Sequence, residues 1–132
     1  MRKIDKIILH CSATPEGRNV TVNDISRWHR DRGFNEIGYH WVIYLDGSVH
    51  PGRPESKIGA HTVGHNATSI GVCYIGGTDA KMKAKDTRTP AQREAIKKLV
   101  AELQKRYPGA TVHGHNEFAA KACPSFNVKI EF

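Results

Sequence analysis

The chain has 132 residues, 39% of them hydrophobic and 25% charged, which fits one globular domain spanning residues 1–132. No apolar run approaches the roughly 18 residues of a membrane-spanning helix, so membrane insertion is not expected. The net charge of +7 fits either a basic solvent-exposed surface without a partner or attraction to a polyanion such as a bacterial envelope. Because the basic residues are scattered and form no nucleic-acid-binding signature, nucleic acid is not expected as that partner.

The cysteine count and the N-terminus both indicate folding in a cytoplasm. Cys11, Cys73 and Cys123 are an odd number of widely spaced cysteines, which favours free thiols or a metal ligand over a disulfide framework. The first residues, MRKIDKIILHCSA, are charged and lack the long apolar segment of a secretory signal. A target outside the cell would therefore be reached only after release.

The first elements in chain order are a strand and a helix. Residues 6–9 (KIIL) form a short apolar run that ends at His10, which indicates a buried strand. Thr21 is a good helix N-cap, and Asp24 adds negative charge to the first turn. We expect this helix to end near Gly33.

A hairpin and a second buried strand follow. Residues 40–45 (HWVIYL) are rich in aromatic and β-branched side chains, and the turn Asp46-Gly47 leads into residues 48–50 as a hairpin. Residues 69–75 (SIGVCYI) predict another buried strand. The polar residues 76–88 predict a loop.

The last elements are a helix and a short strand. Thr89 can cap the helix, Pro90 fits its first turn, and Gln92 can close a capping box. Apolar side chains at helical spacing from Ile96 to Leu103 predict one face packed on a sheet. Residues 110–113 predict a strand. Because strands and helices alternate, the fold class is α/β, with a central sheet covered by helices.

Three potential metal ligands stand at strand-end and loop positions. His10 directly follows the first strand, and His115 and Cys123 share the loop 115–124. Imidazole and thiolate donors suit Zn²⁺, and three protein ligands leave a fourth position for water, as in catalytic sites. From the residues alone, His10 could equally be a hydrogen-bonded strand-end histidine and Cys123 a buried thiol.

Four stretches occur in order along the chain: ILHCSAT, GYHWVIYLDGSV, NATSIGVCYIGG and HNEFAAKACPSF. Together they resemble the phage lysozyme type of N-acetylmuramoyl-L-alanine amidase, a family related to the peptidoglycan recognition proteins. The resemblance runs from about Lys6 to about Lys129, and KACPSF is its most specific motif. It implies a single α/β domain, with a central mixed β-sheet flanked by α-helices and a zinc cleft on one face.

The resemblance also implies an activity and a metal site. The activity is zinc-dependent hydrolysis of the amide between N-acetylmuramic acid and L-alanine in bacterial peptidoglycan. By motif, the zinc ligands are His10 of LHCSAT, Cys123 of KACPS, and His115, eight positions before that cysteine. His113 is the rival, because His113-Gly-His115 could present both rings on one face.

Three further site residues are expected. Tyr39 of GYHW and Lys121 of KACPS match the family's catalytic pair. Zinc lowers the pKa of a bound water from about 15.7 to about 7, a phenol could orient that water or take its proton, and an ammonium could stabilise the oxyanion. From the residues alone, Tyr39 would instead be a core aromatic and Lys121 a solvated cation. We expect His61 of GAHTVGHN to line the groove and contact substrate.

The chain also departs from the family pattern. It starts nine residues before His10, whereas the family carries a longer arm, and some members inhibit a phage RNA polymerase through a surface that includes this arm. Binding to RNA polymerase is therefore not expected, and a C-terminal helix after KACPSF should be short or absent. We expect a monomer of endolysin or autolysin-like character, made in the bacterial cytoplasm and acting on the cell wall after release. The alternatives are a module that binds peptidoglycan without cutting it, and an amidase that also inhibits a phage RNA polymerase.

Overall fold

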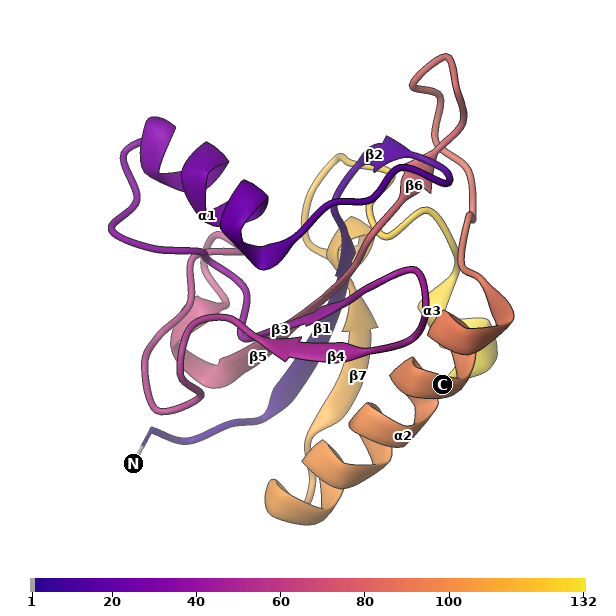
Figure 1. Ribbon diagram of the computed structural model, residues 1–132. Coiled ribbons are helices and arrows are strands. Elements are labelled where there is room, and N and C mark those ends of the chain that lie inside the picture. Colours follow the sequence, from indigo (N-terminus) through magenta and orange to yellow (C-terminus); the bar gives the residue numbers. More distant parts are fainter. Residues whose placement is uncertain (1) are drawn as a thin grey trace.

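The computed structural model describes residues 2–132 and has a five-stranded mixed sheet at its centre (Figure 1). The strand order is β4-β3-β5-β1-β7. Four strands run parallel, namely β1 (Lys6–Cys11), β3 (Trp41–Ile43), β5 (Ser69–Tyr74) and β7 (Thr111–Gly114), and β4 (Val49–Pro51) pairs antiparallel with β3. The expected central mixed sheet with flanking helices is confirmed.

Helices cover both faces of this sheet (Figure 1). On one face, α2 (Pro90–Arg106) packs its apolar side against alternate β1 residues such as Ile7 and Leu9. On the other, α1 (Val22–Asp31) packs Ile25 with Val42 and Ile75. Because successive strand residues face opposite sides, His10 points away from α2. No helix among residues 2–132 is long and apolar enough to cross a membrane.

The predicted helix starts are confirmed in detail. Thr21 and Asp24 form a reciprocal capping box at α1, and Thr89 and Gln92 form another at α2. In each, the threonine hydroxyl accepts a backbone N–H and the longer side chain accepts from the threonine backbone N–H. The side chain of Gln92 also donates to the Ile75 carbonyl at 2.9 Å, so the start of α2 is tied to the sheet.

Several short elements lie outside the predicted ones. A second, two-stranded sheet joins β2 (Thr14–Pro15) to β6 (Gly77–Thr78), the latter within the segment 76–88 expected to be loop. The 3₁₀ helices η1 (Asn66–Thr68) and η2 (His115–Glu117) and the four-residue helix α3 (Val128–Glu131) complete the chain. Elements of two to four residues are too short for hydrophobic periodicity to reveal.

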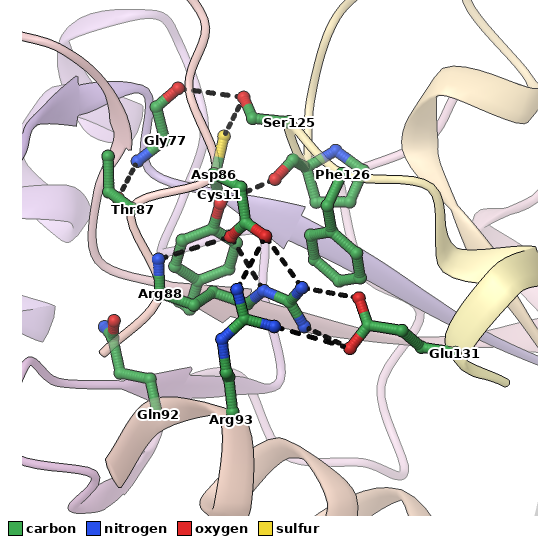
Figure 2. Close-up of polar contacts among 12 residues, drawn as sticks. Cys11, Gly77, Asp86, Thr87, Arg88, Gln92, Arg93, Ser125, Phe126 and Glu131 are labelled. Atoms are coloured by element: carbon green, nitrogen blue, oxygen red, sulfur yellow. Dashed lines mark hydrogen bonds and ion pairs between the residues drawn. The ribbon is translucent and has the colours of Figure 1, made fainter. Parts of the chain in front are cut away.

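The buried side chain of Arg88 binds the C-terminal segment to the rest of the fold (Figure 2). The side chain of Arg88 is only 2% exposed. Its guanidinium pairs with Asp86 at 2.9 Å and with Glu131 of α3, and it stacks over the Phe126 ring at 3.4 Å from the centroid. Nearby, the Tyr74 hydroxyl donates to the carbonyl of Pro124 at 2.6 Å. These contacts fix the segment that immediately follows Cys123.

Replacing Arg88 with Ala should lower the free energy of unfolding by about 2–3 kcal/mol, because two partly buried carboxylates lose their shared cation. This is below the full cost of breaking a buried pair, since both carboxylates are about a quarter exposed. The matched control is Arg93→Ala. Arg93 pairs with the same carboxylates but is 44% exposed, so its loss should be under about 1 kcal/mol. Urea denaturation of both variants measures the difference, and equal losses would contradict this account.

Candidate metal centre

His10, His115 and Cys123 meet at one point of the structure. His10 is buried near the end of β1, His115 opens η2 directly after β7, and Cys123 lies in the loop that follows. One ligand atom from each of the three lies within 4.8 Å of the other two. The Nδ1 atom of His10 is 3.8 Å from the Cys123 sulfur, and the two imidazole rings are 4.6 Å apart between centroids.

The donor set and the spacing fit a metal ion. A tetrahedral zinc ion, with Zn–N of about 2.0–2.1 Å and Zn–S of about 2.3 Å, places nitrogen and sulfur ligands about 3.6 Å apart. The observed 3.8 Å separation of His10 Nδ1 and Cys123 Sγ is close to this. The rival His113 is engaged elsewhere, with its ring nitrogens at 2.9 Å from Glu117 and 2.6 Å from Thr111. The cluster is therefore able to hold a metal through His10, His115 and Cys123.

The local environment favours metal-binding forms of the two histidines. Burial lowers the pKa of His10 well below its ordinary value, and neighbouring histidines add to the effect. Burial, followed by the charge of Lys121, lowers the pKa of His115. Both imidazoles are therefore neutral at neutral pH, the form that coordinates metals.

Cys123 must lose its proton to become a metal ligand. A hydrogen bond with the Cys11 thiol, together with burial, raises the pKa of Cys123. The backbone N–H of Cys11 points at the same sulfur at 3.2 Å and opposes this shift, because it stabilises a thiolate. A metal bound at this site would therefore displace the proton of Cys123.

His61 contacts the His10 ring on the side that faces away from Cys123. Its Nδ1 atom lies 2.9 Å from His10 Nε2, the nitrogen other than the one near Cys123. The residue His61 is 8% exposed, and its Nε2 lies 3.3 Å from the Ser69 hydroxyl. Gly71 makes room for it, because a Cβ there would stand 2.6 Å from the imidazole. His61 is therefore placed to fix the orientation of His10, a contact that the sequence did not predict.

Tyr39 and Lys121 lie beside the metal cluster. Both line two cavities, of about 350 and 220 Å³, that also include His115. The Tyr39 ring is 5.0 Å from the His10 ring, and burial raises its pKa well above the ordinary value. Lys121 is exposed, in the same loop as Cys123. Tyr39 also packs against the apolar residues under α1, so it is a core aromatic and a cavity residue at once.

The sequence predictions missed other residues of these cavities. His29 lines both cavities, and its Nδ1 accepts the Gly38 N–H at 2.9 Å. Arg32 and Phe34 also line the larger of the two. The sequence does contain a signal for Arg32. It follows Ile25 and His29 at helical spacing, which places the three residues on one face of α1. A further cavity, of about 640 Å³, lies between α2 and the β3–β4 hairpin, away from the metal cluster.

Comparison with known proteins decides the family. A model of the family described as N-acetylmuramoyl-L-alanine amidase matches residues 1–126. The chain belongs to this family. The amidase is 46% identical over 125 residues to the endolysin of Escherichia phage T7, covering 95% of this chain and 83% of the relative. It is 43% identical over 128 residues to the endolysin of Klebsiella phage KP32, covering 97% and 85%.

Solved structures share the fold of the amidase. The N-acetylmuramoyl-L-alanine amidase LysC from Clostridium intestinale is similar with a TM-score of 0.85 and 28% identity, covering 98% of this chain and 82% of that one. A mutant of Drosophila PGRP-LB in complex with tracheal cytotoxin has a TM-score of 0.83 and 26% identity, covering 99% and 82%. The expected resemblance, fold and enzyme class are thereby confirmed.

Replacing His61 with Ala should weaken zinc affinity about 10–100-fold, because the His10 ring loses the partner that orients it. Competition with a chromophoric chelator measures the affinity. His50→Ala is the control, because His50 stacks on Tyr44 in the hairpin, away from the cluster, and should leave the affinity unchanged. Unchanged affinity in the His61 variant would show that its contact with His10 is incidental.

Proposed function

We propose that this amidase is a zinc enzyme that cuts the bond between N-acetylmuramic acid and L-alanine in peptidoglycan through His10, His115 and Cys123. The observation that carries the proposal is the convergence of the three ligand atoms within 4.8 Å, beside cavities that also expose Tyr39 and Lys121. Two imidazoles and a thiolate form a donor set suited to zinc, and leave a further position open for catalysis.

A zinc ion held here would supply Lewis-acid chemistry, lowering the pKa of a water molecule and polarising a carbonyl group. The phenol of Tyr39, beside His10, orients the attacking water through a hydrogen bond. The raised pKa keeps this phenol protonated, which favours orientation over proton abstraction. The ammonium of Lys121 stabilises the oxyanion that develops when the amide carbonyl is attacked.

We also propose that His61 contacts substrate with the part of its ring that lines the larger cavity, in addition to orienting His10. Its burial leaves only a small edge for this contact. The substrate would therefore touch His61 from one side, while the ring nitrogens remain bonded within the protein.

The cellular setting is proposed from the relatives. Their names describe endolysins of phages, which supports an enzyme that reaches the cell wall after release from the cell that makes it. We propose that it acts as a monomer, since all the proposed site residues come from one chain, and that it does not bind RNA polymerase. Light scattering should give a mass near 14.7 kDa, and a pull-down should retain no polymerase. A dimer or a retained polymerase would contradict these proposals.

Two sets of variants should separate metal binding from the later chemistry. Cys123→Ser should lose both zinc and the release of stem peptide from purified cell walls, because the weaker oxygen ligand replaces the thiolate. Lys121→Ala and Tyr39→Phe should keep one zinc per chain and lose about 10²–10³-fold in kcat. Metal analysis and mass spectrometry of the released fragments measure both properties.

His113→Ala is the control for these variants and should retain zinc and activity, because its ring bonds to Thr111 and Glu117 outside the cluster. Full activity in Cys123→Ser would contradict the proposal. Wall binding without hydrolysis by the unaltered, zinc-loaded protein would instead favour a binding module.

A further inference from the structure

The walls of the two cavities beside the metal cluster carry an arginine and a lysine but no carboxylate. Among the described residues that line them, none is aspartate or glutamate. Burial lowers the pKa of His29 to about 4, so this ring is neutral at neutral pH. The two cations on these walls are Arg32 and Lys121.

Neither cation is neutralised within the fold. Within residues 2–132, no carboxylate forms an ion pair with Arg32 or Lys121, whereas several other basic side chains are paired. Both side chains belong to exposed residues and both line both cavities. An unpaired cation in a groove without acids attracts an anionic ligand.

The position of Arg32 suits recognition of a planar anion. Arg32 is the C-cap residue of α1, whereas Lys121 lies in the loop that carries Cys123, next to the metal cluster. Its guanidinium stands over the Phe34 ring at 5.5 Å from the centroid, a contact that steadies the group without consuming its charge. The N–H fork of an arginine can then bind a carboxylate through two parallel hydrogen bonds.

The substrate of the proposed reaction offers such groups. A stem peptide ends in a carboxylate and carries another on its glutamyl residue, and many bacteria convert the latter to an amide. We propose that Arg32 binds a free carboxylate of the stem peptide and so determines specificity for unamidated peptidoglycan. The inference rests on the proposed function and assigns Arg32 a binding role, distinct from the oxyanion role of Lys121.

The test compares kcat and KM for two muropeptides that differ only in amidation of the stem-peptide carboxylates. Arg32→Gln should raise KM about tenfold for the free-acid substrate, because a charged hydrogen bond is lost at a solvent-exposed position. Its kcat should stay within about twofold. With the amidated substrate, the same variant should match the unaltered enzyme. Arg32→Lys should recover part of the affinity, since it keeps the charge and loses the fork.

Arg30→Gln is the matched control, because Arg30 is an exposed arginine of α1 that lines neither cavity. It should leave KM unchanged for both substrates. An unchanged KM for Arg32→Gln, or an equal rise on both substrates, overturns the inference while the amidase reaction stands. An unaltered, zinc-loaded enzyme that cleaves neither substrate overturns the proposed function, and the role of Arg32 with it.

Discussion

The parallel pairing of β1 with β7 is the constraint on which the site depends. Leu9 is in register with Gly114, so the next residues along the two strands, His10 and His115, emerge side by side at the same end of the sheet. Because side chains alternate along a strand, a shift of one residue in β1 would turn His10 into the α2 core. The buried apolar residues on both sides of His10 prevent such a shift, so core packing fixes the first two ligands.

The third ligand is positioned by tertiary contacts of another kind. Cys123 lies in a loop whose following residues are fixed by the Tyr74 hydroxyl and by the buried Arg88 network. On the opposite side of the cluster, His61 fits over Gly71 and holds the far nitrogen of His10. The site is thus held by a strand pair, a packed loop and a hydrogen bond between two histidines. This rigidity suits a centre whose ligands must already be in place when the metal arrives.

Local sequence signals predicted most of the fold. The capping boxes at Thr21 and Thr89 and the apolar runs of β1 and β5 depend on neighbouring residues, so they can be read along the chain. The short β2–β6 pair could not be predicted in this way, because a two-residue strand carries no period and its partner lies more than 60 positions away.

The candidate site likewise combines features that the sequence predicts with features that depend on tertiary packing. His10 and Cys123 are 113 positions apart, so only the family motifs could bring them together. The structure brings together the three expected ligands and places Tyr39 and Lys121 beside them. The contact of His61 with His10 and the place of Arg32 in the cavity wall depend on how α1 and the 61–66 loop pack over the sheet. Residue type and spacing do not encode that packing directly.

Anomalous diffraction at the zinc edge, from crystals grown with zinc, tests the central claim most directly. We expect a single strong peak about 2.0–2.1 Å from one nitrogen each of His10 and His115 and about 2.3 Å from the Cys123 sulfur. A peak held by His113 or by surface carboxylates, with these three side chains left unliganded, would contradict it.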